Sequence, residues 1–295
     1  MVDRIRAAAA RVAGHSRHVE IVEEAIEPYA ATLASESPPA PDLEGTLEAR
    51  AAFSLTLNAI NFGSGWFPTL RKAPGMSGFR TVEAGLRAHG PWSAEDLAAM
   101  TRAEIAAAVG QDPDHDLIGH FAVHLRELGT RVRDEHAGSF LEFARSGDGS
   151  AVALAARLAS WPTWHDVSPY DGEGVPFFKR AQIAAADLAL AGIAPADDLD
   201  RLTIFADNLV PHVLRLDGVL RFDDDLVARI ESEQLIEHDS PEEVEIRACA
   251  LHACELLVAA HGSTTATAVD NVLWHRGAGP RYKAVPRHRA RTTAY

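Results

Sequence analysis

Residues 240–260, with the sequence SPEEVEIRACALHACELLVAA, restrict the possible folds of this chain more than any other segment. Ser240 and Pro241 are typical of the cap and first position of a helix, and Glu243 completes a capping-box pattern, so we expect Glu243 to be structural. Beyond this start, apolar side chains occupy nearly every face of the predicted helix. A helix that is apolar all round is a buried one, so other elements must surround it.

Helical periodicity dominates the rest of the chain as well. Residues 19–34 carry an apolar stripe of Val19, Val22, Ala25 and Ile26. Residues 93–110 begin with Ser93 as an expected cap, have Asp96 three positions later and end at Gly110. Further helices are expected in residues 119–146, 150–161 and 175–192. Strand signals are short everywhere, so we predict an all-α fold and one globular domain over residues 1–295, with residues 35–42 as a rigid connector and an irregular basic tail.

Composition excludes some classes of function. The chain has 295 residues and a formal net charge of -14, which opposes a long nonspecific grip on nucleic acid but allows a small anionic ligand in a local basic pocket. Cys249 and Cys254 lie inside an apolar helical pattern and are expected to be buried, reduced thiols. Arg11 interrupts the only stretch that resembles a secretory signal, and no apolar run is long enough to span a bilayer. We therefore expect a cytoplasmic protein with no membrane partner.

The buried helix raises a question about its charges. Glu245 and Arg247 would enter the interior, where an unpaired charge costs several kcal/mol. They need partners, which could be each other's neighbours, the Asp207 region, Lys179 or a polar ligand. The pattern is compatible with structural ion pairs and also with a functional site.

Asp207 lies in TIFADNLVPHVL, residues 203–214, four positions before Pro211. Because proline cannot donate to the carbonyl of Asp207, a helix here is either kinked or begins at this point. Asp207 is therefore either a helix cap or a carboxylate held for chemistry. Lys179 is one of only three lysines, with Lys72 and Lys283, and it is expected at a helix start. That position suits a phosphate or carboxylate partner, although a surface lysine would give the same pattern.

Two further segments could contact a ligand. LNAINFGSGWFP, residues 57–68, brings aromatic rings and amides together beside glycines, an arrangement that suits a planar heterocycle but also an aromatic core. Its candidate residues are Asn58, Asn61, Phe62, Trp66 and Phe67. Trp274 and His275 lie at an expected helix end, as ligand contacts or as simple packing. The pair His120 and His124 lacks a third ligand, so we expect no metal site.

Several of these stretches together resemble one family, the queuosine salvage proteins, which are queuosine 5'-phosphate N-glycosylases. The matching segments are NFGSGW at 61–66, GSFLEFARSGDGSA at 138–151, VPFFKRAQIAAADL at 175–188, TIFADNLVPHVL at 203–214, VEIRACALHACELL at 244–257 and LWHRG at 273–277. The resemblance implies a helical fold akin to helix-hairpin-helix DNA glycosylases. It also implies hydrolysis of the N-glycosidic bond of queuosine 5'-phosphate to queuine and ribose 5-phosphate, without a metal or organic cofactor.

The implied reaction suggests a role for each candidate residue. Asp207 would stabilise the oxocarbenium ion and activate water. Lys179 and Arg247 would bind phosphate or keep the carboxylates ionised, and Glu245 would pair with the base or its amine. Phe62, Trp66 and Phe178 are candidates for a ring sandwich. We expect a monomer that acts on a small molecule, and the alternatives are a deazapurine nucleotide-binding protein without activity or a glycosylase acting on tRNA or DNA.

Overall fold

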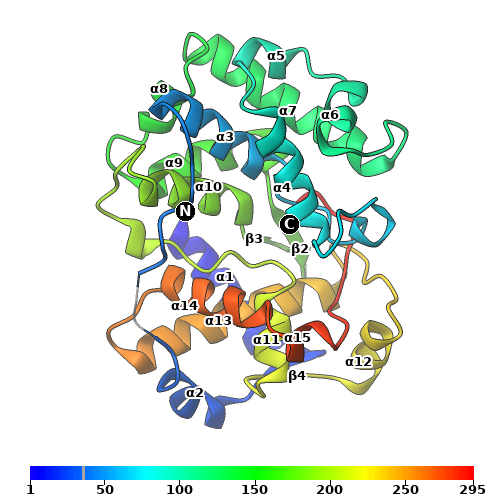
Figure 1. The fold of residues 1–295 in the computed structure, drawn as a ribbon. Coiled ribbons are helices and arrows are strands. Elements are labelled where there is room, and N and C mark those ends of the chain that lie inside the picture. Colours follow the sequence, from blue (N-terminus) through cyan, green and yellow to red (C-terminus); the bar gives the residue numbers. More distant parts are fainter. Residues whose placement is uncertain (35–36) are drawn as a thin grey trace.

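The structure is a computed structural model that describes residues 1–34 and 37–295. Helices form two groups, drawn above and below the centre of Figure 1. The upper group consists of α3 (Leu47–Ala59), α4 (Gly78–His89), α5 (Ala94–Ala98), α6 (Arg102–Val109), α7 (Asp116–Glu135), α8 (Phe140–Arg145), α9 (Ala151–Ala159) and α10 (Lys179–Leu190). The lower group consists of α1 (Val2–His15), α2 (Glu23–Ala30), α11 (Val210–Leu216), α12 (Asp224–Glu231), α13 (Pro241–His261), α14 (Ala266–Gly277) and α15 (Pro280–Lys283).

Two short antiparallel strand pairs and three 3-10 turns supplement the helices. Strand β1 (Val19–Ile21) pairs with β4 (Leu220–Phe222), and β2 (Val167–Tyr170) pairs with β3 (Glu173–Pro176). The 3-10 turns are η1 (Phe67–Thr69), η2 (Pro162–Trp164) and η3 (Leu199–Arg201). The prediction of an all-α fold is broadly confirmed, because the described chain is mostly helical and its strands form only these two short pairs. No helix in the described part of the chain is long and apolar enough to cross a membrane.

Each helix group encloses its own hydrophobic cluster. The first cluster is drawn mainly from residues 51–202, and the second combines residues 5–33 with residues 170–282. Phe178, directly before α10, packs against both clusters. The start of α10 therefore lies where the two clusters meet.

Helix α13 lies in the second cluster and is almost entirely buried, as predicted. Ser240 caps it by accepting a hydrogen bond from the backbone N–H of Glu243, and Gly262 ends it in the left-handed conformation. Helices α1, α2 and α14 and strand β1 pack around it. The reciprocal half of the expected capping box does not form, because Oε2 of Glu243 accepts from the amide of Asp239 at 3.3 Å instead of that of Ser240. Cys249 and Cys254 are buried, and burial raises the pKa of the Cys249 thiol to about 12.

Four predicted helices differ from the structure. Residues 119–146 form α7 and α8 instead of one helix, and in residues 175–192 the helix begins only at Lys179, because Val175 and Pro176 belong to β3. In residues 19–34 the helix begins only at Glu23, because Val19–Ile21 forms β1 against a strand that is distant in the sequence. Residues 93–110 form two helices instead of one. Ser93 and Asp96 do form the capping box of α5, but Thr101 and Glu104 form a second one that starts α6. In the connector at 35–42, the first two residues lie outside the described ones, and the remainder has no regular structure.

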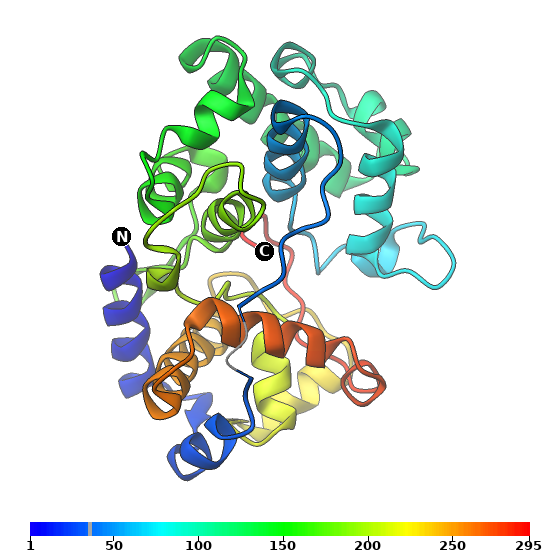
Figure 2. The same cartoon turned by 60° about the vertical axis from the view of Figure 1, so that its left-hand side comes forward.

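The basic tail expected to be irregular, residues 279–295, includes the short helix α15. Its remaining residues, 285–295, pass between the two helix groups, as the two views of Figures 1 and 2 show. Its backbone bonds to both groups. The carbonyl of Arg289 accepts from the amide of Ile236 at 2.9 Å, and the carbonyl of Tyr295 accepts from the amide of Gly63 at 3.1 Å. The Tyr295 side chain is buried. The expectation of an irregular tail therefore holds only after α15, and the last residues of the described chain are part of the interior.

Candidate functional site

Asp207 lies just before α11, which begins at Val210 with Pro211 in its first turn. The helix therefore begins after Asp207, and it is not kinked there. Oδ1 of Asp207 accepts from the amides of Leu209 at 2.7 Å and Val210 at 3.3 Å. Within the described residues, Oδ2 accepts no hydrogen bond. One oxygen thus fixes the carboxylate and the other remains available.

Lys179 is the first residue of α10 and is buried, so the surface-lysine alternative is wrong. Its backbone amide donates to Oδ2 of Asp166 at 3.0 Å, and its Nζ donates to the carbonyl of Asn61 at 3.0 Å. Burial lowers the pKa of the Lys179 ammonium to about 8, and the nearby charge of Asp207 acts in the opposite direction. The lysine and the carboxylate therefore share one electrostatic environment.

Asp270 on α14 belongs to this environment and was missed in the sequence. It is buried, and its Oδ1 accepts from the amide of Phe205 at 2.9 Å. Burial and the charge of Asp207 raise the pKa of Asp270 to about 8, so the carboxyl is largely protonated at neutral pH. The sequence did carry a signal, because Asp270 is the only ionisable residue in the apolar segment 266–273. Like Glu245, an ionisable residue in such a segment is expected to enter the interior and to need a partner there.

Asp187 on α10 is a second carboxyl near Lys179, and its residue is half-buried. Nδ2 of Asn58 donates to it at 2.8 Å, and burial raises its pKa to about 6, against the charge of Lys179. Asn61 is linked to this group through its side chain, which donates to Oδ1 of Asn58 at 3.2 Å. The structure therefore brings Asn61, Lys179 and Asp207 together with Asp187 and Asp270.

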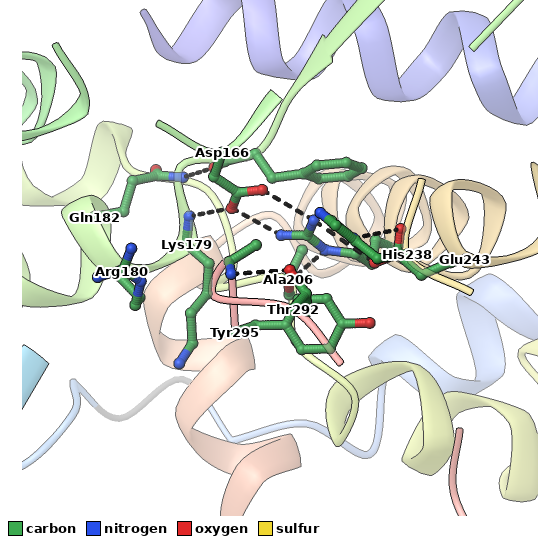
Figure 3. Close-up of polar contacts among 12 residues, drawn as sticks. Asp166, Lys179, Arg180, Gln182, Ala206, His238, Glu243, Thr292 and Tyr295 are labelled. Atoms are coloured by element: carbon green, nitrogen blue, oxygen red, sulfur yellow. Dashed lines mark hydrogen bonds and ion pairs between the residues drawn. The ribbon is translucent and has the colours of Figure 1, made fainter. Parts of the chain in front are cut away.

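Arg247 is completely buried and already paired. Its two Nη atoms donate to Asp166 at 2.9 and 2.8 Å, and its Nε donates to the carbonyl of Ala206 at 3.0 Å. The guanidinium lies 3.9 Å from the ring centre of Phe177 and 4.6 Å from that of Tyr295. Figure 3 shows three of the residues that contact it, Asp166, Ala206 and Tyr295, gathered in one place. Of its two expected roles, pairing with a carboxylate agrees with these contacts better than binding phosphate does.

Glu245 is held entirely by protein groups. Its Oε2 accepts from the amides of Arg17 at 2.9 Å, His18 at 2.6 Å and Val19 at 3.2 Å, and its Oε1 accepts from the hydroxyl of Tyr170 at 2.7 Å. These bonds fasten the turn between α1 and β1 to α13. The structure does not bring Glu245 into the Asp207 group, and its geometry supports a structural role.

The aromatic candidates divide between core and margin. Phe62 and Trp66 belong to the first hydrophobic cluster, with the Phe62 ring centre 4.6 Å from that of His124 and 5.3 Å from that of Phe121. This arrangement agrees with the second of the two predictions for residues 57–68, an aromatic core, and not with a binding site for a planar heterocycle. Phe178 is only partly buried and has a left-handed backbone with φ 50°, a strained conformation for an aromatic residue.

The candidates near the end of α14 lie closer to the surface. Trp274 is half-buried one helical turn after Asp270, and Arg80 of α4 lies 5.4 Å above its ring. This contact joins the two helix groups. His275 is exposed and bonds only to the carbonyl of Asn271 within the described residues, at 2.9 Å. Trp274 is therefore better placed than His275 to face the Asp207 group.

Comparison with known proteins identifies the family. The family model described as queuosine salvage protein matches residues 43–295. The chain belongs to the queuosine salvage protein family. The matched span contains Asp166, Lys179, Asp207, Arg247 and Asp270.

Curated relatives of this queuosine salvage family member occur in bacteria and eukaryotes. A Sphaerobacter thermophilus protein named queuosine 5'-phosphate N-glycosylase/hydrolase is 35% identical over 84% of this chain and 82% of its own length. A protein with the same name from Bos taurus is 29% identical over 69% of this chain and 66% of its own length. Another from Dictyostelium discoideum is 33% identical over 58% of this chain and 56% of its own length.

Proposed function

We propose that this chain hydrolyses the N-glycosidic bond of queuosine 5'-phosphate and releases queuine and ribose 5-phosphate. The relatives that share most of its length carry the name of this activity. The observation that carries the proposal within the site is the free oxygen of Asp207, in a carboxylate fixed by two amides beside a buried lysine and a protonated carboxyl.

Asp207 is assigned to the ribose. Departure of the base leaves positive charge on the sugar, and a fixed carboxylate at the anomeric carbon stabilises that charge and activates the attacking water. Because Oδ1 is occupied by Leu209 and Val210, Oδ2 is the oxygen available to face the sugar. A carboxylate that is already oriented does not have to be reorganised during the reaction.

Asp270 is assigned to the leaving base. A 7-deazapurine lacks the N7 atom that other N-glycosylases can protonate, so negative charge that builds on the base must be taken up by donors along its other edges. A carboxyl with a pKa of about 8 keeps its proton at neutral pH and can donate a hydrogen bond. Lys179, whose Nζ is oriented by the carbonyl of Asn61, supplies a second donor.

The phosphate requires a cation other than Arg247, whose charge is paired with Asp166. We assign this role to Arg287 in the tail. Nδ2 of Asn208, next to Asp207, donates to the carbonyl of His288, next to Arg287, at 3.0 Å, so the two segments are tied together. Arg287 is half-buried and, within residues 1–34 and 37–295, its side chain makes no hydrogen bond or ion pair. An arginine in this state suits a phosphate.

Three expectations about the whole chain, on its fold relationship, its assembly and its place of action, become part of the proposal. The fold is related to that of the helix-hairpin-helix DNA glycosylases, the chain works as a monomeric single domain, and it acts in the cytoplasm on a small molecule without stable nucleic-acid binding. The formal net charge of -14 supports the last point. Superposition on DNA glycosylase structures and light scattering test the first two points.

One experiment tests the activity against both alternatives. The protein is incubated with queuosine 5'-phosphate, free queuosine and queuosine-containing tRNA, and free queuine is followed by chromatography. We expect release from the nucleotide. Tight binding of the nucleotide without release would identify a binding protein, and release from tRNA alone would identify a polynucleotide glycosylase.

A further inference from the structure

A single guanidinium connects the two segments that carry the proposed catalytic groups. Nε of Arg247 donates to the carbonyl of Ala206, the residue directly before Asp207, at 3.0 Å. Its Nη2 donates to Oδ2 of Asp166 at 2.8 Å, and the same Oδ2 accepts from the backbone amide of Lys179 at 3.0 Å. Figure 3 labels Ala206, Asp166 and Lys179, the three residues that this path connects.

Asp166 contributes more than a counter-ion. Its backbone carbonyl accepts from the amides of Phe177 at 3.0 Å and Phe178 at 3.4 Å, while its side chain accepts from that of Lys179. The N-cap residue of α10, Phe178, makes no side-chain cap bond of its own. Asp166 therefore satisfies the amides at the start of this helix, and Arg247 fixes Asp166.

Arginine suits this position for geometric reasons. A planar fork can make two parallel bonds to one carboxylate while a third nitrogen reaches a separate carbonyl, which an ammonium cannot reproduce. The rings of Phe177 and Tyr295 lie 3.9 and 4.6 Å from the guanidinium carbon and favour a flat group. The tail residue Tyr295 thus helps to hold the arginine.

The loop before Asp207 has one other anchor on α10. Gln182 accepts from the amide of Thr203 at 3.0 Å and donates to its hydroxyl at 2.9 Å. That anchor lies four residues before Asp207, whereas the Arg247 bond lies one residue before it. The position of the carboxylate relative to Lys179 is therefore controlled mainly by Arg247.

We infer that Arg247, acting through Asp166 and the Ala206 carbonyl, is a positioning residue that sets Asp207 and Lys179 relative to each other. The inference rests on the proposed function for its kinetic consequence. A displaced carboxylate stabilises the developing cation poorly, but the contacts that bind substrate remain, so kcat falls more than KM changes.

The kinetic test uses Arg247→Lys and Asp166→Asn with queuosine 5'-phosphate, at a temperature where each variant is folded. We expect kcat to fall by about 10-fold or more, with KM within about threefold of wild type. The decisive comparison is made in the Asp207→Asn variant, because the exact position of residue 207 no longer affects the rate once its negative charge is lost. Adding Asp166→Asn to Asp207→Asn should therefore lower kcat by less than about threefold.

Asp217→Asn is the matched control for loss of a partly buried ionic network. Asp217 accepts from the hydroxyls of Tyr29 at 2.7 Å and Tyr282 at 2.8 Å and pairs with Arg276 at 3.2 Å, and it touches neither Asp207 nor Lys179. We expect a lower melting temperature with unchanged kcat per folded molecule. Wild-type kcat in both Arg247→Lys and Asp166→Asn, or full additivity with Asp207→Asn, overturns the inference.

A measurement without turnover separates this inference from the proposed function. The chain has only three lysines, so in Asp166→Asn the ammonium of Lys179 can be titrated by NMR after isotopic labelling of lysine. We expect its pKa to rise from about 8 toward the ordinary value as the start of α10 loosens. An unchanged pKa of Lys179 contradicts the positioning role even if the wild-type protein releases no queuine. Tyr295→Leu is a second variant for the same titration, because it removes the ring beside Arg247 and leaves every hydrogen bond of Arg247 in place.

Discussion

Oδ1 of Asp207 lies 2.7 Å from the backbone nitrogen of Leu209, so the carboxylate satisfies an amide at the start of α11. A structural cap and a catalytic carboxylate are therefore compatible in one residue, since each uses a different oxygen. The amide bonds orient Oδ2 without neutralising the charge.

Asp207→Asn separates the two roles. Asparagine retains an oxygen for the amides of Leu209 and Val210, so we expect the variant to melt within a few degrees of wild type. The negative charge is lost, so queuine release should fall at least ~10²-fold. Calorimetric titration should still detect binding of queuosine 5'-phosphate. Turnover close to that of wild type would assign Asp207 to capping alone.

Arg287→Gln tests the phosphate assignment. Loss of a charge-assisted contact worth roughly 1.5–3 kcal/mol should lower kcat/KM for the nucleotide by about 10- to 100-fold. Free queuosine has no phosphate, so its kcat/KM should hardly change. The measurement is initial rates with both substrates, and Arg289→Gln serves as a control because Arg289 already pairs with Glu233 at 3.4 Å. Equal losses for nucleotide and nucleoside would contradict the assignment.

Asp270 predicts a pH dependence of stability. Burial, with the charge of Asp207, raises its pKa from 3.8 to about 8. Between these values the folded chain holds a proton that the unfolded chain has lost, so the contribution of Asp270 to the free energy of unfolding falls as pH rises from about 4 to 8, by at most about 1.4 kcal/mol per pH unit. Asp270→Asn lacks this contribution. Urea unfolding at pH 5 and pH 8 should therefore show the variant gaining stability relative to wild type at the higher pH.

The same carboxyl predicts a pH dependence of rate. If protonated Asp270 donates to the leaving base, kcat declines as pH rises through about 8. Asparagine donates at every pH, so Asp270→Asn should be slower but should lack the Asp270 component of this decline. Lys179 has a pKa of about 8 as well, and Lys179→Met distinguishes the two contributions. If kcat of Asp270→Asn declines with pH as that of wild type does, the decline is assigned to Lys179.

Glu245→Ala tests the structural role that the contacts of Glu245 support. It leaves the amides of Arg17, His18 and Val19 and the hydroxyl of Tyr170 without their acceptor, which should cost about 3 kcal/mol or more of unfolding free energy. Activity per folded molecule should stay within about twofold of wild type, and Glu245→Gln, which keeps one acceptor oxygen, should lose less stability. A large rise in KM for queuosine 5'-phosphate would instead return Glu245 to substrate binding.

The sequence predicts the helical framework well where the signal is local. Ser240 and Ser93 cap helices where expected, and the apolar circumference of α13 correctly indicates burial. The strand Val19–Ile21 has no such signal, because its partner Leu220–Phe222 is remote in the chain and pairing overrides the helical stripe. The division of residues 93–110 was readable in principle, since Thr101 and Glu104 repeat the capping pattern that was recognised at Ser93.

The site was partly predictable for a related reason. Charged residues in apolar segments, a scarce lysine and an aspartate before a proline all point to unusual environments, and Lys179 and Asp207 do share one. The pattern cannot distinguish a charge that is satisfied by backbone amides, as Glu245 is, from one that is left with a free oxygen, as Asp207 is. That distinction depends on segments brought together only by folding, including the turn after α1 and the tail.

The composition of the two hydrophobic clusters has a consequence for biosynthesis. The first cluster comes mainly from residues 51–202, which leave the ribosome as one continuous stretch. The second needs α1 to find α13, which begins only at Pro241 and is synthesised after the residues of the first cluster. The face of α1 that packs on α13 therefore stays exposed until α13 has been made, while the first cluster is free to assemble. Nascent chains halted before Pro241 should contain a protease-resistant first cluster and an α1 that is readily cleaved or held by chaperones.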